Sequence, residues 1–246
     1  MAKEEFIYGR NPVIEAISAN KQIEKILMLN SLRGELEKEL RHYCKEHSIP
    51  LIKVTEEKLN SLVRSGKHQG VVAFLSPVTY MDLQDVISHE YDQGRLPFII
   101  VLEGVNDSRN IAAIARSAHA LGASAVVLTL KNTARLGEEA VKISAGALLH
   151  IPICRGRNMA AILQTLKNNG IKIISTAMEN AKVIAEADLT GAVALIMGSE
   201  HDGVSAEVLK ESDEVVKIPM DNQFDSLNVS VAAGITMYER IRQLNT

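Results

Sequence analysis

A strand, a polar loop and a helix start follow one another in the C-terminal stretch Ile218-Pro219-Met220-Asp221-Asn222-Gln223-Phe224-Asp225-Ser226-Leu227-Asn228-Val229-Ser230-Val231-Ala232-Ala233-Gly234. The residues before it predict a strand over 214–218, which Pro219 ends because proline has no amide hydrogen to donate. Residues 221–225 favour turns, and Ser226 is expected to cap the helix that follows. That helix is predicted to carry an apolar stripe made of Val231, Ile235, Tyr238 and Ile241.

Such a junction gathers free amide donors at the carboxyl edge of a strand, where open α/β sheets bind ligands. Small residues in the first helical turns leave room there for a ligand or another backbone segment. An ordinary C-terminal helix packed on a sheet fits the same stretch. The segments upstream therefore have to decide between the two interpretations.

Composition favours a soluble α/β protein with an aliphatic core. The chain has 246 residues, 46% of them hydrophobic, and no tryptophan, which suits one large domain or two small ones. We expect no membrane span and no signal peptide, since no apolar run is long enough and the first residues are polar. Cys44 and Cys154 match no metal or redox spacing, so we expect buried thiols in a reducing cytoplasm.

The formal net charge of −3 argues against bulk nonspecific binding of nucleic acid. Residues 1–75 are slightly basic, however, and residues 76–246 are acidic. Any contact with a polyanion should therefore come from local patches.

A first unit is predicted over residues 1–75, with helices and strands alternating as a small α/β sandwich. Its last strand, at residues 70–75, follows a basic polar loop with no apolar residue to bury. This loop fits either a solvated turn or a contact to RNA phosphates and base edges. With Arg10, its candidate RNA-binding residues are Arg64, Lys67, His68 and Gln69.

Residues 76–96 are predicted to form a linker with a short helix at about 81–91. From residue 97 to 246, apolar strands at 98–102, 125–130, 171–176, 192–197 and 214–218 alternate with helices at 110–121, 138–148, 159–168 and 206–210. Buried strands that alternate with helices predict a parallel sheet covered on both faces.

The first strand of this sheet leads into a loop and a helix that carry two arginines. At about 100° per residue, Arg109, Ala112, Arg116 and His119 share one side of the helix. The helix dipole contributes roughly 0.3–1 kcal/mol to anion binding and a charged hydrogen bond roughly 1.5–3 kcal/mol, so the arginines would dominate a phosphate site. Surface arginines paired with nearby acids fit the pattern as well.

A second loop follows the fourth strand and reads Gly198-Ser199-Glu200-His201-Asp202-Gly203. Its acidic and histidine side chains leave a metal site conceivable, although adjacent residues on one loop rarely converge on one ion. A GxGxxG motif is missing after the first strand, so a nucleotide-dependent oxidoreductase is weakly supported.

Together these segments resemble the SpoU/TrmH-type RNA ribose 2'-O-methyltransferases of the SPOUT superfamily. The resembling residues are Asn110 and Arg116, Gly198-Ser199-Glu200 with Gly203, and Ile218-Pro219-Met220 with Ser226-Leu227-Asn228-Val229-Ser230. Supporting matches are Lys142-Ile143-Ser144-Ala145-Gly146-Ala147 before His150, His68-Gln69-Gly70-Val71-Val72-Ala73, and Ile7-Tyr8-Gly9 through Glu15-Ala16. The first residues resemble the branch that modifies large-subunit ribosomal RNA.

The resemblance implies a parallel-sheet catalytic domain with a C-terminal trefoil knot, S-adenosylmethionine as cofactor, no metal, and a homodimer whose active site lies near the interface. It implies a folded RNA substrate, with a guanosine of large-subunit ribosomal RNA first and transfer RNA second, recognised partly by the N-terminal domain. The implied catalytic residues are Asn110, Arg116, Glu200, Ser226 and Asn228; Arg109 is expected to contact RNA. The implied cofactor-binding residues are Thr176, Met197, Gly198, Ser199, Ile218, Met220 and Leu227.

Some residues depart from the family pattern. Ser108-Arg109 stands where proline and another residue are frequent, Ala112 and His201 stand where glycine is common, and residues 221–225 replace a glycine-containing stretch. The last departure lies beside the cofactor segment. It leaves open a non-catalytic RNA-binding or ribosome-assembly factor on the same fold.

Overall fold

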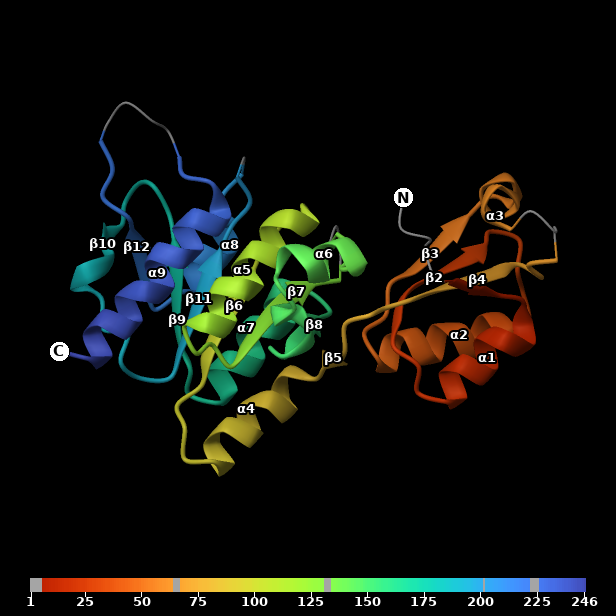
Figure 1. The fold of residues 1–246 in the computed structure, drawn as a ribbon, viewed down its shortest axis with the longest axis horizontal. Coiled ribbons are helices and arrows are strands. Elements are labelled where there is room, and N and C mark those ends of the chain that lie inside the picture. Colours follow the sequence, from red (N-terminus) through yellow and green to blue (C-terminus); the bar gives the residue numbers. More distant parts are fainter. Residues whose placement is uncertain (1–5, 64–66, 131–133, 201, 222–225) are drawn as a thin grey trace. The chain divides into compact units, whose positions relative to one another are not determined.

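The computed structural model describes residues 6–63, 67–130, 134–200, 202–221 and 226–246 (Figure 1). It divides into two compact units, which are described separately. The first is Met1–Val78 with Arg135–Glu138, and the second is Thr79–Ala134 with Glu139–Thr246. Among the described residues, no helix is long and apolar enough to cross a membrane.

The first unit is a four-stranded sheet in the order β1-β4-β2-β3 with helices on both faces. Alternate side chains of β2 explain the two layers, since Ile26 packs with α1 and α2 and Leu27 packs with α3. The strand β1 pairs antiparallel with β4 and extends the expected pattern by one strand. The elements are β1 (Phe6–Tyr8), α1 (Arg10–Ser18), β2 (Ile23–Leu29), α2 (Glu35–Glu46), β3 (Leu51–Val54), α3 (Glu56–Leu62) and β4 (Val71–Leu75).

Most of the segment predicted as a linker instead belongs to the second unit. It contributes β5 (Tyr80–Met81), which pairs parallel with β8, and α4 (Leu83–Asp92). Leu83, Val86 and Ile87 of α4 are buried in the core of that unit. Their apolar spacing anchors the helix, so only the residues before Thr79 and after α4 act as connections.

The second unit holds an eight-stranded sheet in the order β10-β12-β9-β11-β6-β7-β8-β5, and every described strand pair is parallel. This confirms the α/β fold class with a buried parallel sheet. The strands are β6 (Phe98–Leu102), β7 (Ala125–Thr129), β8 (Ile153–Gly156), β9 (Lys172–Thr176), β10 (Lys182–Val183), β11 (Val193–Met197) and β12 (Glu214–Lys217). The helices are α5 (Ser108–Ala120), α6 (Glu138–Ile143), α7 (Met159–Asn168), α8 (Ala206–Glu211) and α9 (Val229–Leu244), with 3-10 turns at η1 (Ala147–Leu149) and η2 (Ile184–Glu186).

The helix α6 and the strand β8 also differ from expectation. The helix predicted over 138–148 ends at Ile143, since Ala145 and Gly146 have positive φ and α6 gives way to η1. The strand β8 was not predicted, because its four residues combine Ile153 and Cys154 with a charged Arg155. Cys154 and the Cys44 of the first unit are buried free thiols.

Helices cover both faces of the second sheet. Ile99 and Val101 of β6 share a core with α4, α7 and α8, whereas α5 and α9 lie side by side on the other face (Figure 1). On α9 the predicted stripe is largely wrong as a core face, because Val231, Ile235 and Tyr238 are exposed and Ala233 and Met237 are buried. The trefoil knot stays a prediction, because residues 222–225 of the connection from β12 to α9 lie outside the described residues.

Candidate active site

A cavity of about 430 Å³ opens at the carboxyl ends of β9, β11 and β12. The last residues of these strands, Thr176, Met197 and Lys217, lie in its wall. All seven residues implied for cofactor binding line this cavity, as do Glu200 and Ser226. The remaining lining residues had no predicted catalytic or cofactor-binding role and are Ala177, Met178, Asp202, Gly203, Val204, Lys217, Val229 and Ala232.

Close contact between two backbone segments shapes the loop after β11. A Cβ at Gly198 would lie 1.9 Å from the carbonyl carbon of Gly203, so only glycine fits there. Gly203 donates a hydrogen bond from its amide to the carbonyl oxygen of Ser199 (3.0 Å) and has φ +66°. The two glycines therefore fold the loop back on itself beside the cavity.

The metal-binding alternative for this loop gains no support from the described residues, which hold no group of three potential metal-ligating side chains placed around one point. His201 lies outside the described residues.

Glu103, at the end of β6, fixes the far side of the same loop. Its carboxylate accepts hydrogen bonds from the Ser205 backbone amide (2.9 Å) and the Ser205 hydroxyl (2.8 Å). Ser205 is also the N-cap of α8 and accepts from the Val208 amide. No local sequence pattern predicts this link, because Glu103 and Ser205 are 102 residues apart.

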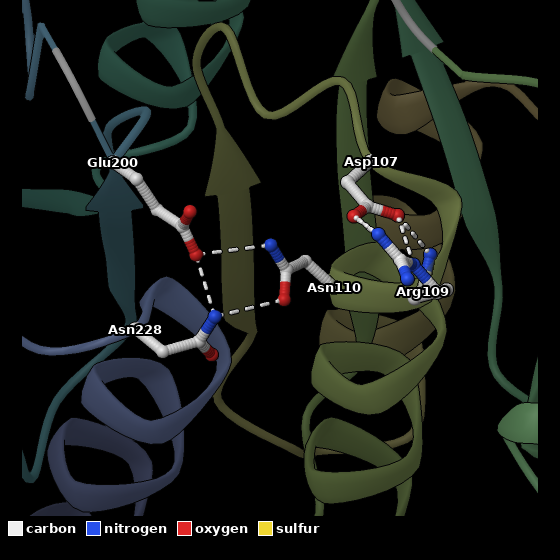
Figure 2. A network of polar contacts seen from close by, with 5 residues as sticks. All are labelled: Asp107, Arg109, Asn110, Glu200 and Asn228. Carbon is white, nitrogen blue, oxygen red and sulfur yellow. Dashed lines mark hydrogen bonds and ion pairs between the residues drawn. The ribbon is translucent and has the colours of Figure 1, made fainter.

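Three of the implied catalytic residues meet at the rim of the cavity (Figure 2). The Glu200 Oε1 atom accepts hydrogen bonds from the amide nitrogens of Asn110 (3.1 Å) and Asn228 (2.5 Å). The Asn228 amide nitrogen also donates to Asn110 Oδ1 (3.1 Å). This Asn-Glu-Asn network joins the start of α5, the loop after β11 and the start of α9.

Asn228, and not Ser226 as predicted, caps α9. Its side-chain oxygen accepts hydrogen bonds from the Ser230 amide (2.9 Å) and the Ser230 hydroxyl (2.5 Å). The helix therefore begins at Val229, and Ser226 lies before it in the cavity wall. Both residue types are good caps, so the sequence could not separate the two positions.

The two arginines of α5 differ in their surroundings. Arg109 pairs with Asp107, the N-cap of α5, at 2.7 Å, as Figure 2 shows. The Arg109 guanidinium lowers the pKa of Asp107 by hydrogen bonding, with help from the Arg109 amide. The sequence predicted two arginines free to bind a phosphate. Arg109 is less available than expected, because it already has an anionic partner.

Arg116 is exposed, and none of the described residues accepts a hydrogen bond or ion pair from it. It is six residues beyond Asn110, which places the two side chains about 120° apart around the helix. Asn110 therefore does not orient Arg116 within one protomer, and Arg116 is not among the residues lining the cavity. The catalytic role of Arg116 stays a prediction.

Arg116 lies on α5, which packs beside α9. Ser117 of α5 lies opposite Gly234 of α9, since a Cβ at Gly234 would be 4.0 Å from the Ser117 hydroxyl. Arg116 and Ile235 are the sequence neighbours of these two residues, and both are exposed. We call the exposed residues Arg116, Val231, Ile235 and Tyr238 the outer face.

The candidate RNA-binding residues of the first unit also differ among themselves. His68 is only 4% exposed, and its ring nitrogens contact Asn60 Oδ1 (3.1 Å) and the Gly70 amide (3.0 Å). The prediction of an RNA contact is therefore replaced by a structural role for His68. Gln69 accepts a hydrogen bond from the Arg10 amide (2.8 Å) at the start of α1.

Lys67 and Arg10 are exposed, and Arg10 lies 3.8 Å from Glu35. Both side chains are accessible to solvent, and Arg10 has Glu35 as a neighbouring carboxylate. Arg64 lies outside the described residues.

Comparison with known proteins agrees with both units. The model of the SpoU rRNA Methylase family matches residues 97–238, and a model for RNA 2'-O ribose methyltransferase substrate binding matches residues 6–81. A relative from Staphylococcus saprophyticus, named as a TrmH family tRNA/rRNA methyltransferase, is 34% identical over 99% of this chain and 97% of its own length.

A longer relative from Synechocystis, named as a tRNA/rRNA methyltransferase, is 32% identical over 97% of this chain, which spans 62% of that relative. The crystal structure of an AdoMet-bound rRNA methyltransferase from Sinorhizobium meliloti superimposes with a TM-score of 0.61, at 24% identity, over 97% of this chain and 87% of that chain. With the two family models in chain order and the S. saprophyticus match spanning both units, the chain belongs to the SpoU rRNA Methylase family and is a SpoU/TrmH-type RNA methyltransferase.

Proposed function

We propose that this chain methylates a ribose 2'-hydroxyl in structured RNA, with a guanosine of large-subunit ribosomal RNA as its target. The observation that carries the proposal is the Asn-Glu-Asn network at the rim of the cavity. It brings polar groups from three distant segments next to a concave site, which suits the orientation of a hydroxyl beside a bound cofactor.

The cavity suits S-adenosylmethionine. Met197, Ile218 and Leu227 offer apolar surface to an adenine ring, and the tight backbone turn at Gly198 leaves peptide groups accessible to hydrogen bonding. The S. meliloti structure is described as AdoMet-bound. When bound, the cofactor supplies a methyl group that its sulfonium already makes electrophilic. The chain then has to hold the ribose in line and exclude water.

Arg116 is proposed to act across a homodimer. The outer face combines an unpaired cation with three exposed apolar side chains of α9, which is the composition expected of a subunit interface. A two-fold axis through this face would carry Arg116 of one protomer towards the cavity of the other. The arrangement would bring to the site an arginine that lies outside the cavity of its own protomer.

Arg116 is proposed to bind the nucleotide phosphate and to stabilise the alkoxide that develops on the ribose. It is a poor general base, because a guanidinium stays protonated far above neutral pH. A phosphate oxygen or a water molecule would take the proton. Asn110 and Asn228 would position the ribose, with Glu200 fixing both amides, and Ser226 would hold the edge of the site.

Ribosomal RNA is preferred as substrate because the first unit matches a substrate-binding model and the catalytic unit matches a family named for rRNA methylation. Arg10 and Lys67 are the described residues of the first unit proposed to contact RNA. Transfer RNA is the alternative substrate, since the relatives' names include both. Mapping ribose methylation in cells that lack this chain would separate the two.

The proposed chemistry is tested by calorimetry with S-adenosylmethionine and by turnover on RNA. We expect cofactor binding, and a loss of turnover of about 10²–10³ in Arg116→Ala, the scale of removing one preorganised charge-stabilising donor. Arg95→Ala is the matched control, because Arg95 pairs with Glu90 before the amino end of β6. Absence of cofactor binding at millimolar concentration would favour the assembly-factor alternative, and near-normal turnover of Arg116→Ala would refute its role.

A further inference from the structure

The cavity wall contains a lysine that no catalytic or cofactor role yet explains. Lys217 is the last residue of β12 and is half-buried where it lines the cavity. None of the described residues accepts a hydrogen bond or ion pair from it. The neighbouring lysines differ, since Lys172 and Lys182 both pair with Glu214 at 2.7 and 2.5 Å.

An unpaired ammonium group in the wall of a cavity is stabilised most by an anionic ligand. Part of its hydration is lost to the surrounding protein, and a charged hydrogen bond to a carboxylate or phosphate oxygen replaces it. The acidic groups of the cavity are placed elsewhere. Glu200 and Asp202 come from the loop after β11, and β9 separates that strand from β12 in the sheet.

Opposite charges therefore line opposite sides of the cavity, with a cation on the β12 side and carboxylates on the β11 side. A ligand that carries an anionic and a cationic group close together matches this division. The amino-acid part of S-adenosylmethionine has a carboxylate, an ammonium and a sulfonium within a few bonds of one another.

We propose that Lys217 binds the carboxylate of the cofactor's amino-acid part. This assignment rests on the proposed function, because it takes S-adenosylmethionine as the ligand of the cavity. Lys217 thereby fixes one end of the cofactor and leaves the acidic side of the cavity facing its cationic groups.

The test is a comparison of two ligands by calorimetry. S-adenosylmethionine carries the carboxylate, and 5'-methylthioadenosine keeps the adenosine and a methyl-bearing sulfur, as a neutral thioether, but has no amino-acid part. Lys217→Met is expected to weaken binding of S-adenosylmethionine by about 10- to 100-fold, the scale of one charged hydrogen bond. Binding of methylthioadenosine should change by less than about twofold, since the lost contact is absent from that ligand.

Three further variants control the result. Lys217→Arg keeps the charge and should recover most of the affinity, and Lys217→Gln gives a second neutral side chain if the methionine variant folds poorly. Lys210→Met changes an exposed lysine on α8 outside the cavity and should bind both ligands as the unmodified chain does. Thermal unfolding of each variant would report any loss of structure.

Equal weakening of both ligands, or no weakening of either, would overturn the assignment. A loss of RNA affinity with unchanged S-adenosylmethionine affinity would also overturn it, because the lysine would then bind a phosphate. Failure of the unmodified chain to bind S-adenosylmethionine would refute the proposed cofactor itself, and the inference would fall with it.

Discussion

Replacing Gly198 by alanine tests whether the tight loop after β11 shapes the cofactor cavity. The new Cβ would lie 1.9 Å from the carbonyl carbon of Gly203, 2.2 Å from its oxygen and 2.2 Å from the amide nitrogen of Val204. All three are backbone atoms, so no side-chain rotation can relieve the clash. Reaching even the shortest separation that real Cβ atoms show, 3.0 Å, requires the two segments to part by about 1 Å.

Such overpacking costs about 1–3 kcal/mol. For a chain of this size, each kcal/mol lowers the unfolding midpoint by about 2–4 °C. If binding requires the original loop shape, the same cost weakens S-adenosylmethionine binding by about 5- to 140-fold. A displacement of about 1 Å next to reacting groups can further reduce turnover by about 10²-fold.

The assay combines thermal unfolding, calorimetry with S-adenosylmethionine, and turnover on RNA. Gly191→Ala is the matched control, because a Cβ at Gly191 would meet no atom within 4 Å. We expect the control to match the unmodified chain in all three measurements. The account of the loop would be refuted if Gly198→Ala matched it as well.

Three more results are expected. Arg240→Leu should destabilise the fold by about 1–3 kcal/mol in urea unfolding, because the buried guanidinium donates hydrogen bonds to the carbonyl oxygens of Leu189 and Gly191; a stability equal to that of the unmodified chain would contradict its role. Ile235→Lys should shift sedimentation from dimer to monomer, whereas Leu96→Lys, another exposed apolar position, should not; an unchanged dimer would exclude the outer face as the interface. Burial raises the pKa of Cys44 and of Cys154 from 9.0 to about 12, so neither thiol should react with iodoacetamide at pH 8 before unfolding. Rapid labelling of the folded chain would contradict this low reactivity. Because the folded state holds the two thiol protons more tightly, the stability that the thiols contribute is complete below about pH 9 and is lost as the pH rises towards 12.

Continuous apolar runs were enough to predict the central strands. Phe98–Leu102 and Val193–Met197 are buried at every residue, as a parallel sheet covered on both faces requires. On α5 the apolar residues Ile111, Ile114 and Ala118 recur every three or four positions, and all three are fully buried. In these elements local spacing and tertiary packing agree.

The exposed side of α9 shows where spacing is insufficient. Val231, Ile235 and Tyr238 repeat as a core stripe would, but they face away from the sheet. Apolar periodicity indicates that one face of a helix is covered by something. The spacing is the same whether that face packs in the core of one protomer or in a subunit interface. His68 is a related case, because a polar loop residue can be buried when both ring nitrogens find partners.

The candidate site could be anticipated only through the family resemblance. Asn110 and Glu200 are 90 residues apart, and Asn110 and Asn228 are 118 residues apart, so no local pattern predicts their contact. The need for glycine at position 198 depends on where Gly203 returns in space. The position of Lys217 in the cavity wall depends on β9, β11 and β12 lying side by side in the sheet, which no local pattern predicts.

The most direct test of a site shared between two protomers is a complementation measurement. Arg116→Ala and Glu200→Gln chains are each expected to be nearly inactive as homodimers. If the chain forms the proposed homodimer, coexpression gives mixed dimers in which one cavity would keep Glu200 and receive Arg116 from the other protomer. If Arg116 acts across the interface, random pairing should restore roughly a quarter of the original turnover. Turnover that stays at the level of the two inactive homodimers, in samples where mixed dimers are shown to form, would contradict the account.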